Sequence, residues 1–108
     1  MRSLFFKQRF LDMILRGSKR LEGRVGYGGI SKLKSGDLIL LNGEYEARIG
    51  KIWRFRTFRE ALGELDFRLL IPDANSESEA LSVYEQLYPN WKQEQLGVYV
   101  FEIKYPAR

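Results

Sequence analysis

The chain has 108 residues, 44% of them hydrophobic and 14% aromatic, which is ordinary for a globular protein and predicts one domain over residues 1–108. Cysteine and histidine are both absent, so disulfide bonds, the usual zinc sites and Ser-His-Asp or Cys-His catalysis are excluded. Lysine and arginine number 18 against 14 acidic residues, and the net charge of +4 suits an anionic partner such as RNA without requiring one.

The first residues predict a short strand followed by a helix. Residues 3–6 read as the strand, and residues 7–16 read as the helix because apolar side chains recur there at helical spacing. Phe6 and Phe10 fall on the apolar face of this helix. Gly17 then stands where a left-handed C-terminal cap is expected.

Residues 20–25 predict a strand in which charged and apolar side chains alternate. The charged face consists of Arg20, Glu22 and Arg24. A strand with a wholly charged face is expected to direct it at something specific. A glycine-rich loop over residues 27–33 follows, with room for one helical turn, and residues 34–37 predict a turn.

The middle of the chain predicts a β-hairpin. Residues 38–41 form a short apolar run typical of a buried strand, and Asn42-Gly43 is a strong signal for a turn of the primed type. The returning strand is expected over residues 45–55. No apolar run in the chain is long enough to cross a membrane or to form a signal peptide, so a cytoplasmic location is expected.

Two helices and a final strand complete the predicted order. Residues 57–60 form a capping box for a short helix that Gly63 ends, and residues 76–79 form a second box for a helix reaching about Tyr88. Residues 97–105 predict the last strand, with apolar side chains on both of its faces.

This order of elements predicts an α+β fold. A tight hairpin makes its two strands antiparallel, and a chain-terminal strand commonly pairs with an early one. We therefore expect a small mixed β-barrel with flanking helices, although periodicity alone does not establish that the barrel closes. The aromatic residues near the late helix, Tyr88 and Trp91, are expected to pack in the core.

One segment has the spacing Gly-x-Lys-x-x-Glu-x-Arg, formed by Gly17, Lys19, Glu22 and Arg24. This segment resembles the signature of the ASCH (activating signal cointegrator homology) family, and the order of the later elements is similar to that family too. The resemblance implies a PUA-like barrel with a cleft lined by the motif, and a role in RNA metabolism. Family members are thought to bind RNA, and branches are reported to cleave RNA or to hydrolyse acetylated cytidine nucleosides.

The charged residues of the motif suit a nucleotide. Arg24 can offer a bidentate fork to phosphate or to a base edge, and Lys19 can offer a compact charge. Glu22 can accept hydrogen bonds from an exocyclic amine such as that of cytosine. From spacing alone, an ion pair between Glu22 and Arg24 on a solvated face is the simpler interpretation. The resemblance favours a binding site for RNA or a nucleotide-like small molecule, in a monomer with no metal and no cofactor.

A metal-independent hydrolase is the alternative. The resemblance implies that members of the amidohydrolase branch use a lysine, a threonine three residues later and an acidic residue before the late helix. Lys19 matches the lysine, Glu22 occupies the threonine position, and Asp73 falls near the acidic position. An ionised Glu22 would oppose the lowered pKa that a catalytic lysine needs, although Glu22 could itself activate water. Asp73 follows Pro72 and also has a simpler interpretation as a turn residue.

Two further places carry residue types that nucleic acids use. Tyr27, in the glycine-rich loop, can stack on a base at the rim of the cleft, although the loop does not match a P-loop or dinucleotide fingerprint. Residues 51–59 interleave basic and aromatic side chains, as single-strand binders do. We interpret them as an aromatic core face and a solvated basic face, from which Arg54, together with Lys32, can add positive charge to the site.

Overall fold

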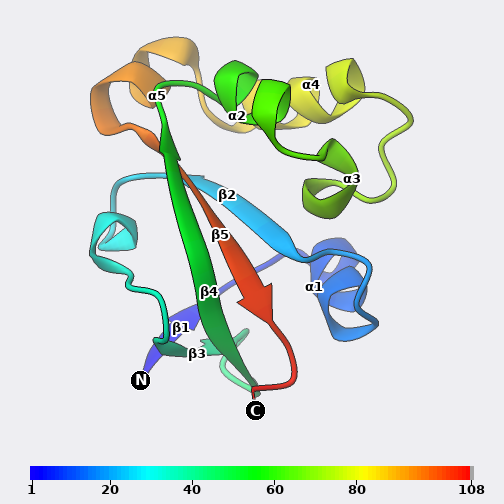
Figure 1. Cartoon of the computed structure of the whole chain (residues 1–108), viewed down its shortest axis with the longest axis vertical. Helices are drawn as coiled ribbons and strands as arrows, with labels where there is room; N and C mark the ends of the chain where they lie inside the picture. Colours follow the sequence, from blue (N-terminus) through cyan, green and yellow to red (C-terminus); the bar gives the residue numbers. More distant parts are fainter. Residues whose placement is uncertain (108) are drawn as a thin grey trace.

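The computed structural model describes residues 1–107, and its strands form one sheet with helices at one end and at the side (Figure 1). The elements are β1 (Arg2–Leu4), α1 (Gln8–Leu15), β2 (Leu21–Val25), η1 (Ile30–Lys32), β3 (Leu38–Leu41), β4 (Tyr45–Phe55), α2 (Phe58–Glu64), α3 (Phe67–Leu70), α4 (Glu77–Leu87), α5 (Asn90–Leu96) and β5 (Val98–Lys104). Helices α2 to α5 lie together over one end of the sheet, and α1 lies at its side. No helix within residues 1–107 is long and apolar enough to cross a membrane.

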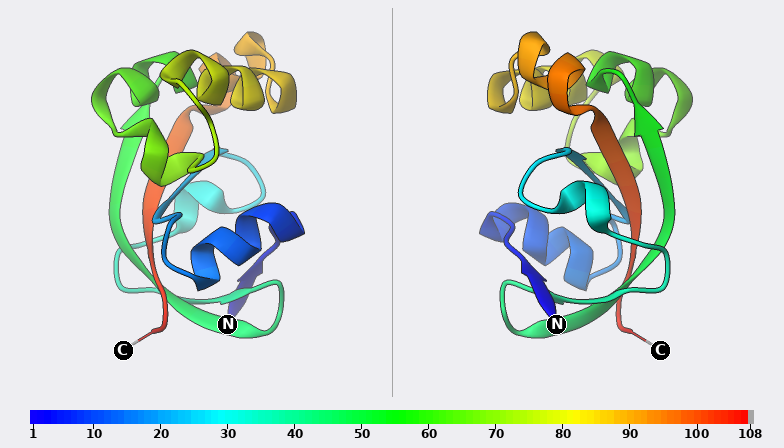
Figure 2. Two further views of the ribbon diagram at one scale, coloured as in Figure 1. Left: turned by 90° about the vertical axis from the view of Figure 1, so that its right-hand side faces the viewer. Right: turned by 90° about the vertical axis from the view of Figure 1, so that its left-hand side faces the viewer.

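The five strands have the order β1-β3-β4-β5-β2. Strand β1 pairs with β3 in parallel, and the other three pairs are antiparallel, including the expected pair of the last strand with the early β2. Figure 2 shows how strongly the long strands curve. Strands β1 and β2 are nevertheless the two edges, so the sheet is mixed and barrel-like but not closed. The α+β fold is confirmed, but the sheet is an open, curved one and not a closed barrel.

The hairpin of β3 and β4 has the predicted turn. Asn42 and Gly43 have positive φ angles of 52° and 72°, as a primed turn requires, and the backbone amide of Glu44 donates to the carbonyl of Leu41. The Asn42 side chain also reaches outside the turn. Its Oδ1 accepts from the Phe6 amide at 2.8 Å, and its Nδ2 donates to the Phe6 carbonyl at 3.0 Å. The Asn42 side chain therefore fixes the linker between β1 and α1 to the hairpin turn.

The sheet buries apolar side chains on both faces, which explains why β5 has apolar residues at successive positions. Val98 and Val100 face an upper core under α2, α3 and α4, whereas Phe101 and Ile103 face a lower core beside α1 and β3. The upper core comprises Leu21, Val25, Phe58, Ala61, Leu62, Leu70, Ile71, Ala80, Leu81, Tyr84, Val98 and Val100. The half-buried Phe10 of α1 packs against both cores, so the two meet near the start of that helix.

Both predicted capping boxes are confirmed. The Thr57 hydroxyl accepts from the Glu60 amide at 3.2 Å, and the Ser76 hydroxyl accepts from the Glu79 amide at 3.1 Å. The predicted end of the first of these helices at Gly63 is wrong by one residue, because α2 continues to Glu64. The first strand is also displaced toward the N-terminus, since β1 ends at Leu4 and leaves the next two residues in the linker to α1.

Two helices, α3 and α5, were not expected from the sequence. In α5 the buried side chain is polar: Gln93 is fully buried, accepts from the Phe58 amide at 2.9 Å and donates to the Tyr88 carbonyl at 2.7 Å. The expectation that Trp91 packs in the core is wrong, because its side chain lies on the outer surface of α5 and is 63% exposed. Tyr88 is half-buried and its ring stacks on that of Phe58.

Candidate functional site

Gly17 directs the motif away from α1. Its φ of 89° is in the left-handed region, and nothing lies near the place of a Cβ atom, so backbone conformation is the reason for glycine here. The amides of Ser18 and Lys19 both donate to the Met13 carbonyl, at 3.0 and 3.1 Å. The chain is thus wrapped back over the end of α1 before it enters β2.

Lys19 lies beneath the cleft and not on its surface. The residue is 2% exposed, and its ammonium group donates to the carbonyls of Leu21 at 2.7 Å and Leu70 at 2.5 Å. The Nζ atom is also 3.1 Å from Oε1 of Glu22. An ammonium group has three N–H donors, and here each has an acceptor. The charge of Lys19 therefore serves to hold β2, α3 and Glu22 together.

Glu22 is held between two cations. Its Oε2 accepts from Nε of Arg24 at 2.8 Å, opposite the contact of Oε1 with Lys19. Lys19, Glu22 and Arg24 therefore form a row of alternating charges. At its outer end, Arg24 donates to the Phe5 carbonyl at 2.7 Å, and its guanidinium group lies 4.8 Å from the centre of the Phe6 ring. The ion pair of Glu22 and Arg24 is present, but their side chains are only 12% and 21% exposed. The face that carries them is therefore not a solvated one.

The charges of this row shift the pKa values of its members. Burial raises the pKa of Glu22, but Lys19 and Arg24 outweigh it, and the pKa is lowered below its ordinary value. Burial lowers the pKa of Lys19, and the nearby Glu22 carboxylate opposes this only in part. Glu22 is therefore ionised at neutral pH. A carboxylate has about four acceptor positions, so two remain for a ligand.

A cavity of about 210 Å³ opens beside Glu22, between β2, α4 and the linker from β1 to α1. Its walls are largely apolar and aromatic. The lining residues are Phe5, Phe6, Lys7, Phe10, Lys19, Glu22, Gly23, Arg24, Ile71, Val83, Tyr84, Leu87 and Tyr88. A Cβ atom at Gly23 would lie 2.8 Å from the Phe58 ring and 3.5 Å from that of Tyr84, so glycine lets this wall approach β2.

Tyr84 lines this cavity, and its hydroxyl oxygen is buried at the cavity wall. The residue is 3% exposed, and within residues 1–107 its hydroxyl makes no hydrogen bond of ordinary geometry, although it lies beside the Gly23 backbone. Burial raises the pKa of Tyr84 well above its usual value, and the negative charge of Glu22 raises it further. The group is therefore a neutral phenol. A buried polar group without a partner is costly, which suggests that a ligand completes it.

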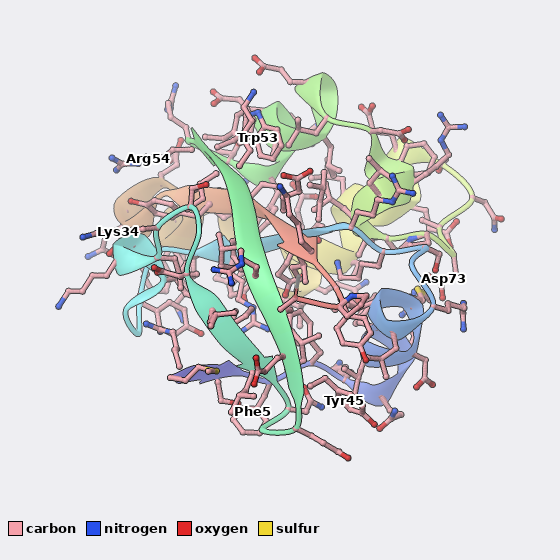
Figure 3. The ribbon with its side chains drawn as sticks, turned by 60° about the horizontal axis from the view of Figure 1, so that its bottom comes forward. Phe5, Lys34, Tyr45, Trp53, Arg54 and Asp73 are labelled. Carbon is pink, nitrogen blue, oxygen red and sulfur yellow. The ribbon has the colours of Figure 1, made fainter. Side chains whose placement is uncertain are left out.

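The other residues singled out from the sequence lie in different places. Tyr27 is 51% exposed and lines a neighbouring cavity that also includes Arg24, and Gly17 lines a third hollow on the far side of Lys19. Arg54 is exposed, and its guanidinium group lies 5.5 Å from the centre of the Tyr99 ring. Asp73 is half-exposed and pairs with Arg9 at 2.6 Å. Figure 3 shows Arg54 and Asp73 on opposite sides of the molecule.

The structure thus joins Lys19, Glu22 and Arg24 in one row, but it does not bring Asp73 to them. Several cavity residues were not predicted as site residues: Phe6 and Phe10 were expected only on the apolar face of a helix, and Tyr84 only within the helix predicted to reach about Tyr88. Periodicity does not distinguish a tyrosine whose hydroxyl is satisfied from one whose hydroxyl is free. In the part of the chain that the structure describes, no cluster of three or more acidic side chains could hold a metal ion.

Comparison with known proteins identifies the family. The model of the ASCH domain matches residues 4–107, so the chain belongs to the ASCH domain family, and membership supports a general role in RNA binding or RNA metabolism. The crystal structure of the hypothetical protein PH0355 is similar, with a TM-score of 0.89 and 25% identity, over 96% of this chain and 98% of that one.

The solution NMR structure of protein PF0455 from Pyrococcus furiosus is similar as well. Its TM-score is 0.79 and its identity 28%, over 95% of this chain and 94% of that one. No curated protein matches the chain in sequence. Both likenesses extend over nearly all of this chain, which confirms the PUA-like fold.

Proposed function

We propose that this ASCH domain binds RNA by taking one unstacked base into the cavity between β2 and α4. The observation that carries the proposal is that an ionised carboxylate, Glu22, and Tyr84, whose buried hydroxyl has no hydrogen bond of ordinary geometry within residues 1–107, line one aromatic-walled cavity. Proteins that read RNA sequence commonly splay bases out of single strands, stack them on aromatic rings and hydrogen-bond their edges. The cavity offers both kinds of contact.

The polar groups define the edge of the base that fits. Glu22 only accepts hydrogen bonds, so it suits an exocyclic amine, as found on cytosine, adenine and guanine. The neutral Tyr84 hydroxyl can both donate and accept, so it suits a ring nitrogen or carbonyl beside that amine. Uracil has no amine, and we expect it to bind less well than cytosine.

Arg24 is the residue of the row best placed for the sugar-phosphate backbone. It is partly exposed and uses two of its five N–H donors, on Glu22 and on the Phe5 carbonyl, so three remain. Lys19 has no free donor and acts through Glu22 as a positioning residue. Because Lys19 is sealed in and Asp73 is paired elsewhere, the geometry favours binding over hydrolysis.

Tyr84→Phe tests this proposal with little risk to the fold. It removes only a hydroxyl that lacks an ordinary protein partner within residues 1–107, so the folding stability should be unchanged or higher. Binding of a labelled pool of short single-stranded RNA, followed by fluorescence anisotropy, should weaken about two- to ten-fold, as expected for one lost hydrogen bond. Equal binding by Tyr84→Phe would contradict the assignment of the cavity.

A second pair of variants separates site charge from overall charge. Arg24→Ala and Arg68→Ala each remove one arginine, but Arg68 is 72% exposed and pairs with Asp66 outside the cavity. We expect Arg24→Ala to lose ten-fold or more in affinity, since a charged group loses its contacts at the site, and Arg68→Ala to lose little. Similar losses in both variants would mean that binding is only a diffuse effect of net charge.

A further inference from the structure

We infer that the site holds two adjacent nucleotides of single-stranded RNA, the first base in the cavity beside Glu22 and the second nucleotide in the gap between strands β1 and β2. The inference rests on the proposed function and extends it to the size of the bound unit. The sheet does not close, because β1 and β2 are its two free edges. The gap between its two edges contains a second cavity, of about 240 Å³.

The two cavities are neighbours with a common wall. Phe5, Arg24 and Tyr88 line both of them. The second cavity adds the end of β2, the opposite edge strand β1 and the glycine-rich loop, through Val25, Arg2, Ser3, Leu4, Tyr27, Gly28 and Ile30. A chain that leaves the first cavity past Arg24 therefore enters the second directly.

The volumes also favour a ligand larger than one ring. Pockets for whole small-molecule ligands usually measure about 300 to 1,000 Å³. Each of these cavities, at about 210 and 240 Å³, is smaller than that range, whereas the two together fall within it. One cavity matches a single base, and the pair matches a longer unit.

The charge in the second cavity suits the phosphate that links two nucleosides. Its lining contains two arginines, Arg2 and Arg24, and no acidic residue. The Arg2 guanidinium group donates to the backbone carbonyls of Gly28 and Gly29 and has no ion pair within the described residues. Its charge is therefore not neutralised by a carboxylate. A phosphodiester passing between the two arginines would supply that negative charge.

Exposed aromatic rings stand where the second base would lie. Phe5 is 68% exposed and Tyr27 is 51% exposed, although large aromatic side chains usually bury most of their surface. The ammonium group of Lys92 lies 5.4 Å from the centre of the Tyr27 ring, which adds positive charge beside the stacking surface. Stacking of a base on such a ring, next to a cation, is the usual way in which proteins bind single strands. An apolar protein segment would leave these cations without partners.

The test compares mononucleotides with dinucleotides by isothermal titration calorimetry. The probes are the four ribonucleoside monophosphates and the sixteen ribodinucleotides. We expect the best dinucleotide to bind wild-type protein roughly ten-fold or more tightly than the best mononucleotide, as one further stacked base allows. In Tyr27→Ala this ratio should fall to roughly one to two, whereas Tyr27→Phe, which keeps the ring, should preserve most of it.

Trp91→Ala is the control for loss of an exposed ring beside Lys92: the Trp91 ring lies 5.9 Å from the Lys92 ammonium group but lines neither cavity, so the ratio should stay at the wild-type value. A ratio near one in wild type, or a ratio that survives Tyr27→Ala, would overturn the second nucleotide and leave the single-base site standing. If neither mononucleotides nor dinucleotides bind, and the RNA pool does not bind either, the proposed function itself fails and the inference fails with it.

Discussion

Lys19 is the residue whose role differs most between the sequence and the structure. Its place in the motif predicts a side chain that reaches a ligand, yet it is buried with three acceptors around its ammonium group. The decisive acceptor is the carbonyl of Leu70, which is 51 positions away in a four-residue helix. A pattern of nearby residues carries no information about such a distant backbone group. By contrast, the joint placement of Glu22 and Arg24 on one face follows from strand alternation and could be predicted.

Lys19→Met should destabilise the fold strongly. Methionine keeps the unbranched apolar stem, one atom shorter than lysine, but Glu22 loses one of its two cations and the carbonyls of Leu21 and Leu70 lose a donor. Removing one partner of a buried ion pair typically costs about 3–5 kcal/mol. The free energy of unfolding in urea measures this, with Lys34→Met, at an exposed turn, as control. Equal small losses in both variants would show that the Lys19 charge has no structural role.

Glu22 predicts an acid-sensitive contribution to stability. Its pKa is lowered in the folded protein, so the unfolded chain, with a pKa of about 4.3, binds the proton more readily. The contribution is therefore fully present above about pH 4.3 and is lost as the pH falls through the folded pKa. Unfolding free energies of wild type and Glu22→Gln should differ most near neutrality, and the difference should shrink below about pH 4. A difference independent of pH would contradict this.

Elements with strong local signals were predicted well, and those without them were missed. Strand β4 has the predicted limits, Tyr45–Phe55, because a primed turn precedes it and a capping box follows it. Helix α5 has no apolar stripe, since its buried member is Gln93 and its tryptophan faces outward. Helix α3 has only four residues, which is too short for periodicity to appear. The formation of both helices therefore depends on tertiary contacts with distant parts of the chain, which local sequence patterns do not encode.

Asn42 gives a prediction for the hairpin and the linker that it holds. Asn42→Gly keeps the positive φ but removes two hydrogen bonds to Phe6, which cost about 0.5–1.5 kcal/mol each. Asn42→Ala should cost about 1–2 kcal/mol more, because a Cβ atom disfavours the left-handed conformation. Thermal or urea unfolding should give the order wild type, Gly variant, Ala variant, while Glu44→Ala, exposed in the same turn, should change little. A Gly variant as stable as wild type would show that the bonds to Phe6 are unimportant.

At the scale of the whole molecule, pairing was predictable but closure was not. The match of the last strand with an early one follows from general preferences, and β5 does pair with β2. Closure depends on whether β1 and β2 meet, and in this chain a cavity lined by side chains from both strands separates them. The Arg24 guanidinium group crosses from β2 to the Phe5 carbonyl, and Arg2 reaches from β1 to the glycine-rich loop. Sequence alternation says nothing about such bridging.

The number of phosphates that the molecule neutralises sets the salt dependence of RNA binding. For single strands, the slope of log K against log salt concentration is about −0.7 per phosphate. A site for two nucleotides engages one or two phosphates, so we expect a slope of about −0.7 to −1.4 over about 50 to 200 mM salt, by anisotropy with short RNA. A much steeper slope would mean that RNA follows a wider surface, including the basic residues of β4 such as Arg54.

The two unpaired edges of the sheet have a consequence for self-association. An open strand edge can pair with the edge of a second copy, and natural proteins block this with short edges and charged side chains. Strands β1 and β2 have only three and five residues, and Arg2 and Arg24 cover the space between them. We therefore expect the two arginines proposed to contact RNA to hinder pairing between copies of the chain as well. Arg24→Ala is expected to aggregate more readily than Arg68→Ala on storage, so sedimentation velocity should accompany every binding measurement on that variant.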